Sequence, residues 1–159
     1  RVVAPRRQGV EYSIEHSGDS FYILTNDDAM NFKVAVAPTA TPGLEHWSEL
    51  VPHDKEVYIL GVDAFRNHLV LSQRRDGYRE LKVMDLRDGS SRVLELPERV
   101  STVRPNVNAE FDTDVYRFGY TSMTTPSLMP SSIQPPTAPH QPQSRHTSPP
   151  HSEAHPWRA

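Results

Sequence analysis

Ser20 is the first residue whose type and setting could do chemistry. It follows Gly18 and Asp19, and a Gly-Asp-Ser block can carry a nucleophilic serine. The patterns on both sides of the block are those of strands, which favours a hairpin turn between them. The chain contains no Gly-x-Ser-x-Gly elbow, the motif that presents the nucleophile in α/β-hydrolases. We therefore interpret the block as a turn.

A second group of residues could bind a metal ion, because oxygen-bearing side chains occupy every second position of one loop. They are Asn106, Asn108, Glu110, Asp112 and Asp114. A calcium loop of the EF-hand type needs glycine at its sixth position and an acid at its twelfth. Counted from Asn106, those positions hold Phe111 and Arg117. The spacing therefore favours a solvated loop between strands.

The C-terminal region offers two weaker candidates. Its four histidines could bind a divalent metal weakly, but interleaved prolines prevent a shared helical face: His140, His146, His151 and His155. Residues 136–139 and 139–142 fit the minimal Pro-x-x-Pro pattern for polyproline II recognition. No acid/base pair or nucleophile constellation stands out. We assign no catalytic, cofactor-binding or metal-binding residue and expect no cofactor.

Composition divides the chain in two. Residues 126–159 hold nine of the fifteen prolines, four of the eight histidines and a single aromatic residue, Trp157. This tail has no apolar periodicity, so we predict that it is disordered. Residues 1–125 hold nearly all the material for a core. Their 15 basic and 19 acidic side chains give −4, and the tail adds +1 from two arginines against Glu153.

These numbers exclude several partners and compartments. Neither part is basic enough to suggest a nucleic-acid partner. No apolar run approaches the length of a membrane span. The chain has no cysteine, which fits a reducing compartment. It begins at Arg1 and shows no signal peptide, so we interpret it as a fragment.

The elements that position these residues are all strands. Period-2 alternation or continuous β-type runs bounded by turn residues predict ten of them: 10–15, 21–25, 32–37, 47–51, 57–65, 69–72, 81–86, 92–96, 100–103 and 115–122. Asp-Gly pairs at 76–77 and 88–89 mark two hairpins. No amphipathic helix of useful length is present.

The strands recur with a period. The hydroxyl residues that end each second strand are Thr25, Ser72 and Thr121, which are 47 and 49 residues apart. A four-stranded unit that recurs at about 40–50 residues is typical of a β-propeller blade. We predict an all-β partial propeller of about three antiparallel blades, at 9–52, 57–97 and 100–125. A β-sandwich is the alternative, since its strands also follow one another closely.

Several blocks, in turns as well as strands, resemble oligopeptidase B (protease II) of the prolyl oligopeptidase family of serine peptidases. They are residues 9–16, 18–19, 21–26, 31–33, 47–53, 63–65, 110–114 and 118–126. The resemblance covers residues 1–127 and implies the later blades of an N-terminal propeller. It implies a cytoplasmic endopeptidase that cuts short peptides after Arg or Lys, with an α/β-hydrolase domain following the propeller. The family's catalytic Ser, Asp and His have no matching positions here, so we expect this chain alone to be inactive.

The resemblance stops at Leu128, close to the start of the Pro-rich tail. A frameshift would produce such a change. Translation of the DNA beyond codon 127 in the other two frames would then restore strand patterns and a Gly-x-Ser-x-Gly elbow. The alternative is a non-catalytic β-rich binding module whose tail recruits a partner.

Overall fold

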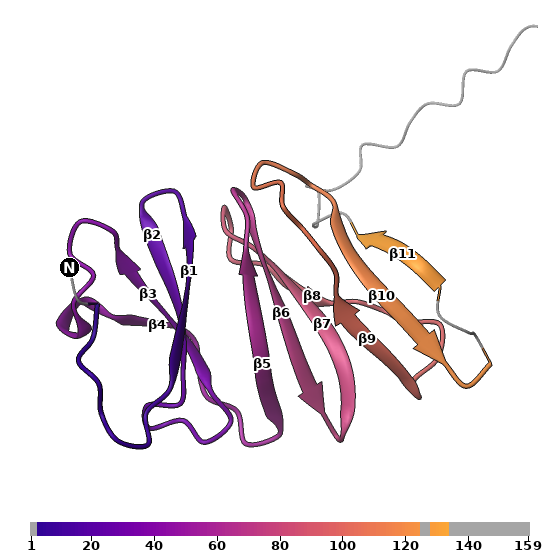
Figure 1. The fold of residues 1–159 in the computed structure, drawn as a ribbon, viewed down its shortest axis with the longest axis horizontal. Coiled ribbons are helices and arrows are strands. Elements are labelled where there is room, and N and C mark those ends of the chain that lie inside the picture. Colours follow the sequence, from indigo (N-terminus) through magenta and orange to yellow (C-terminus); the bar gives the residue numbers. More distant parts are fainter. Residues whose placement is uncertain (1–2, 125–127, 134–159) are drawn as a thin grey trace, which may run out of the picture.

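The computed structural model describes residues 3–124 and 128–133 and is an all-β structure, which confirms the predicted fold class (Figure 1). The first sheet consists of β1 (Tyr12–Ser17), β2 (Ser20–Thr25), β3 (Lys33–Pro38) and β4 (Ser48–Val51), with a short 3-10 helix, η1 (Leu44–His46), before β4. The second consists of β5 (Val57–Ala64), β6 (His68–Arg75), β7 (Tyr78–Asp85) and β8 (Ser91–Val93). The third consists of β9 (Ser101–Pro105), β10 (Tyr116–Ser122) and β11 (Leu128–Ile133).

Each sheet is an antiparallel meander in chain order, β1-β2-β3-β4, β5-β6-β7-β8 and β9-β10-β11. The three sheets stand side by side in the order of the sequence (Figure 1). The predicted hydroxyl marker residues all lie on second strands, Thr25 on β2, Ser72 on β6 and Thr121 on β10. The period in the sequence is therefore the repeat of one sheet. No helix among the described residues could cross a membrane.

Strand β6 is the centre of the packing. Leu69, Val70 and Leu71 are each 0 % exposed. Leu69 and Leu71 belong to a core shared with the first sheet, whereas Val70 belongs to a core shared with the third. Alternate side chains of a strand point to opposite faces, so one strand contributes to both cores. Each such side chain stabilises the fold by about 1.5–3 kcal/mol.

Polar bonds join the sheets at their seams. The Ser17 hydroxyl of β1 donates to the carbonyl oxygen of Phe65, just after β5, at 2.7 Å. The Tyr116 hydroxyl of β10 donates to Asp63 of β5 at 2.6 Å. Because both acceptors lie in or next to β5, this strand is the polar contact point of the second sheet with both neighbours.

Both hairpins predicted at the Asp-Gly pairs are present, but only one has a two-residue turn. Asp76 and Gly77 join β6 to β7 with φ of 51° and 83°, the left-handed values that a two-residue turn requires. The second pair, Asp88 and Gly89, lies in a longer hairpin loop between the paired strands β7 and β8. Five residues, 86–90, separate β7 from β8, and only Gly89 has a positive φ, 73°. The Asp88 carboxylate accepts from the Ser90 N–H at 2.8 Å, which supports a wider loop.

The prediction that residues 126–159 are disordered is wrong at six positions, 128–133, which form strand β11. It pairs with β10, with Tyr116 opposite Ile133 and Phe118 opposite Ser131. The register shifts between Phe118 and Tyr120, where the β11 strand passes through Pro130. A bulge on an edge strand tolerates proline, because no ladder bond is needed there. The rest of the predicted tail, including its histidines and Pro-x-x-Pro motifs, lies outside the described residues.

Candidate functional site

The Gly-Asp-Ser block, a candidate nucleophile site in the sequence, lies at a hairpin turn. Gly18 and Asp19 form the turn of the β1–β2 hairpin, and Ser20 is the first residue of β2, paired with Ser17 and Pro38. The serine thus lies where the hairpin interpretation placed it.

Two polar side chains of the oxygen-rich loop 106–114, Asn108 and Asp112, bind residues outside the loop. The Asn108 amide accepts from the Arg117 N–H at 2.7 Å and donates to the Arg117 carbonyl at 3.0 Å. Asp112 forms an ion pair with Arg66 at 3.1 Å, which ties the loop to the β5–β6 turn. Among residues 3–124 and 128–133 no cluster of three or more His, Asp or Glu could hold a metal ion.

The first strands of the first two sheets come together. β1 lies against β5, whereas β4 and β8, the last strands of the same sheets, make no comparable contact within the described chain. The two sheets therefore diverge from an inner edge formed by β1 and β5. In a propeller, sheets radiate in this way from a central channel. The inner edge is our candidate functional site.

A groove of about 340 Å³ opens between these two strands. Its apolar wall includes Leu24, Phe32, Tyr58 and Leu60, and Glu11 also lines it. The rings of Phe32 and Tyr58 meet edge to face with centroids 5.6 Å apart, and Tyr58 is 39 % exposed. We call this feature the inner groove.

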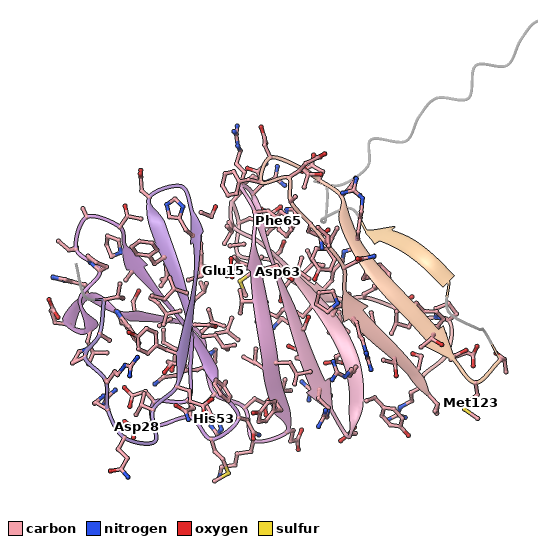
Figure 2. The ribbon with its side chains drawn as sticks, in the orientation of Figure 1. Glu15, Asp28, His53, Asp63, Phe65 and Met123 are labelled. Atoms are coloured by element: carbon pink, nitrogen blue, oxygen red, sulfur yellow. The ribbon has the colours of Figure 1, made fainter. Side chains whose placement is uncertain are left out.

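Two carboxylates lie further along the inner edge, Glu15 on β1 and Asp63 on β5, and they stand next to each other in Figure 2. Burial, and secondly the charge of Asp63, raise the pKa of Glu15. Burial, and secondly the hydrogen bond to Asp63, raise the pKa of Tyr116 far above its usual value, so the phenol stays a donor. Asp63 is thus held by Tyr116, while Glu15 has no ion-pair partner in the part of the chain that the structure describes.

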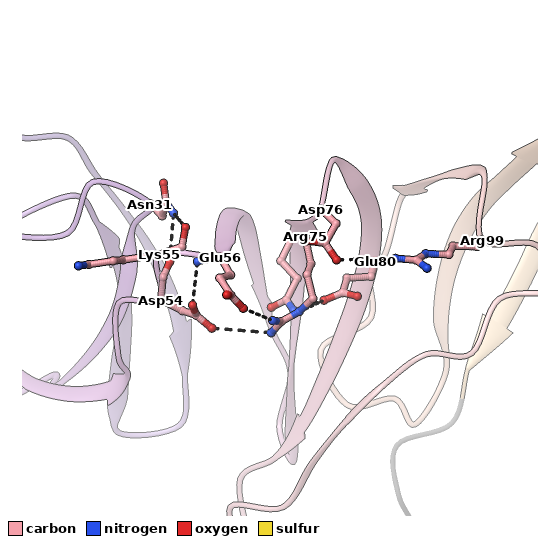
Figure 3. A network of polar contacts seen from close by, with 9 residues as sticks. Asn31, Asp54, Lys55, Glu56, Arg75, Asp76, Glu80 and Arg99 are labelled. Carbon is pink, nitrogen blue, oxygen red and sulfur yellow. Dashed lines mark hydrogen bonds and ion pairs between the residues drawn. The ribbon is translucent and has the colours of Figure 1, made fainter.

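A separate polar network covers one end of the sheets (Figure 3). Arg75 lies among three carboxylates, 3.7 Å from Asp54, 3.6 Å from Glu56 and 3.8 Å from Glu80. Asn31 donates to the carbonyl oxygens of Asp54 and Lys55 at 3.1 and 2.8 Å. These contacts join the first sheet to the second, but Arg75 is 42 % exposed, so each pair contributes little to stability.

Sequence reasoning missed Glu15, Asp63 and Tyr58. One signal could have found the two acids. They are 48 residues apart, which matches the period of the repeat, and they occupy first strands of successive sheets. The contribution of Tyr58 to the groove depends on its contact with Phe32, which no periodicity predicts.

Successive antiparallel meanders of this period, of which the first two diverge from their first strands, define the chain as a β-propeller segment. The chain belongs to the prolyl oligopeptidase family. Residues 1–129 match the family model described as "Prolyl oligopeptidase, N-terminal beta-propeller domain". The resemblance seen in the sequence is confirmed.

Several relatives have names or titles of peptidases. "Dipeptidyl aminopeptidase BI" of Pseudoxanthomonas mexicana is 38 % identical over 127 residues, which are 79 % of this chain and 17 % of that protein. Oligopeptidase B of Trypanosoma brucei with bound antipain matches with a TM-score of 0.71 and 33 % identity, over 80 % of this chain and 19 % of that one. Oligopeptidase B of Leishmania major gives a TM-score of 0.70 and 32 % identity, over 79 % and 19 %. The chain therefore spans less than a fifth of each of these relatives.

Proposed function

We propose that the chain forms part of the substrate-gating propeller of an oligopeptidase B-like serine endopeptidase of the cytoplasm, which cleaves short peptides after Arg or Lys. In this proposal the blades are later ones of the ring, and the partner is an α/β-hydrolase domain that carries the catalytic Ser, Asp and His. The 159-residue chain itself would hydrolyse nothing. Its part in the reaction is steric, because a channel between blades admits extended peptides and excludes folded proteins.

The observation that carries the proposal is the inner edge. Each of the two strands pairs along one edge with the next strand of its own sheet, β1 with β2 and β5 with β6. The other edge of each has no strand partner among the described residues. Each strand has one acid and no Lys or Arg. A channel wall with this charge would attract peptides that carry Arg or Lys, in agreement with the proposed specificity.

A chimaera tests the proposal. Residues 9–124 would replace the aligned segment of dipeptidyl aminopeptidase BI, since 38 % identity makes the packing compatible. We expect the chimaera to cleave a short Arg-containing peptide amide and to leave intact a folded protein that displays the same site. A folded chimaera that is inactive, or one that digests the folded protein, would refute the proposal.

A second candidate, release of dipeptides from free N-termini, is favoured by the name of that same relative. The propeller determines which peptides reach the active site. The measured quantity is the ratio of activity on an N-acetylated peptide to activity on the same peptide with a free amine. A higher ratio in the chimaera than in the host supports the endopeptidase. An unchanged ratio supports the second candidate.

A further inference from the structure

We propose that the inner groove is a non-catalytic subsite for an extended peptide, which seats one apolar side chain against Tyr58 and Phe32 and carries Lys or Arg beside it. This inference rests on the proposed function, because it names what the inner edge of the propeller would bind. It concerns a binding step separate from cleavage.

The size and lining of the groove fit a side chain. Its volume of about 340 Å³ lies at the lower end of the range for ligand pockets. Leu24, Ile59 and Leu60 supply the aliphatic wall beside the Phe32–Tyr58 pair. Two aromatic rings in edge-to-face contact present a firm surface with few rotatable bonds, which lowers the entropy lost on binding.

The backbone around the groove fits an extended chain. β1 pairs only with β2, and β5 pairs only with β6, within the described sheets. The N–H of Ile59 donates to the Asn31 carbonyl at 3.0 Å, which closes one end of the β5 edge. Beyond Ile59 the edge has no strand partner, so its peptide groups can pair with a bound peptide by strand addition.

Charge selects a basic occupant over a neutral or acidic one. Glu11 lines the groove, and Glu15 lies four residues further along the chain on β1. Neither carboxylate has an ion-pair partner among residues 3–124 and 128–133, and the next charged group along the inner edge is the acid Asp63. An Arg or Lys of the peptide would complement this negative strip.

The test uses the whole 159-residue chain, below the concentration at which it self-associates, and follows the fluorescence anisotropy of a labelled short peptide with a central Phe flanked by Lys. We expect saturable binding that weakens about 10-fold in Tyr58→Ala, because the main apolar contact is lost. Tyr58→Phe keeps the ring and should bind as the unmodified chain does. Tyr78→Ala is the matched control, because Tyr78 is 37 % exposed but lies outside the groove.

Charge is tested separately. Glu15→Gln should weaken binding about threefold at about 20 mM salt and have little effect at about 300 mM salt, whereas Glu49→Gln on β4 should have no effect at either. A peptide with Glu in place of Lys should not bind. Leu60→Gln, on the free edge, provides a second apolar variant if Tyr58→Ala fails to fold by circular dichroism.

Absence of saturable binding, or equal losses in Tyr58→Ala and Tyr78→Ala, would overturn the inference. The inference would also fail if the peptide did not bind and sedimentation showed that Tyr58→Ala abolishes dimerisation. The groove would then hold a second copy of the chain. These outcomes leave the chimaera result untouched. A chimaera that digests folded proteins would refute the gating function even if the peptide bound.

Discussion

His68 should make the stability of this fold sensitive to mild acid. Its imidazole is 1 % exposed and stacks on the ring of Phe65 with centroids 4.7 Å apart and an interplanar angle of 11°. Neither ring nitrogen has a hydrogen-bond partner within the described residues. A buried polar group without a partner costs about 1–3 kcal/mol, so the site tolerates the neutral form and opposes the charged one.

The direction of the effect follows from the pKa. Burial lowers the pKa of His68, an effect that the charges of Asp114 and Asp85 oppose and that of Arg87 reinforces. The unfolded chain, with a pKa of about 6.5, therefore binds the proton more readily than the folded chain does. Stability is fully present above that pKa and falls as the pH drops below it. Asp85 does not contribute in this window, because Arg87 holds its pKa at about 2.

The magnitude is set by proton linkage. If the folded chain stays unprotonated at His68, the free energy of unfolding falls by about 1 kcal/mol between about pH 7 and about pH 5.5. Urea unfolding followed by tryptophan fluorescence at the two pH values would measure it. His68→Leu should remove this loss, and it also replaces an unpartnered polar group with an apolar one. It should therefore raise stability by about 1 kcal/mol at about pH 7 and by about 2 kcal/mol at about pH 5.5.

The control is His46→Gln, since His46 lies in η1 with an exposed side chain and should not affect the pH dependence. If His68→Leu shows the same fall in stability as the unmodified chain, His68 does not cause the acid sensitivity. A reduced pH dependence in His46→Gln would equally show that the assignment to His68 is wrong.

Three further predictions concern the seams, the core and the edges. Tyr116→Phe removes the 2.6 Å bond to Asp63 and should cost about 1.5–3 kcal/mol in urea unfolding; a value near zero would show that water replaces the phenol. Leu71→Ala leaves a cavity in the core beside β6 and should lower the free energy of unfolding by about 2–5 kcal/mol. Val93→Ala, on the exposed strand β8, should lower it by less than about 0.5 kcal/mol. Equal values would contradict the two-sided core. The chain should self-associate through its uncovered strand edges, so a monodisperse, cooperatively melting monomer in sedimentation experiments would count against an incomplete ring.

Local patterns were enough to predict the strands and their grouping. Alternation and β-type runs depend on neighbouring residues, as does the Asp76-Gly77 turn, whose left-handed backbone needs only Gly and Asp in sequence. The period of the repeat follows from the same patterns counted along the chain. β11 escaped prediction because β10 supplies main-chain pairing to a segment with little apolar periodicity of its own.

The inner edge required the tertiary structure. The sequence determined that Glu15 and Asp63 are one period apart on first strands. That spacing places them at equivalent positions of successive sheets, however the sheets pack. Only the packing of β1 against β5 partly buried Glu15 beside Asp63, which raises the pKa of Glu15, and opened the groove beside Tyr58. Distances between sheets depend on how side chains of both faces interlock, and that information is not local to any stretch of the chain.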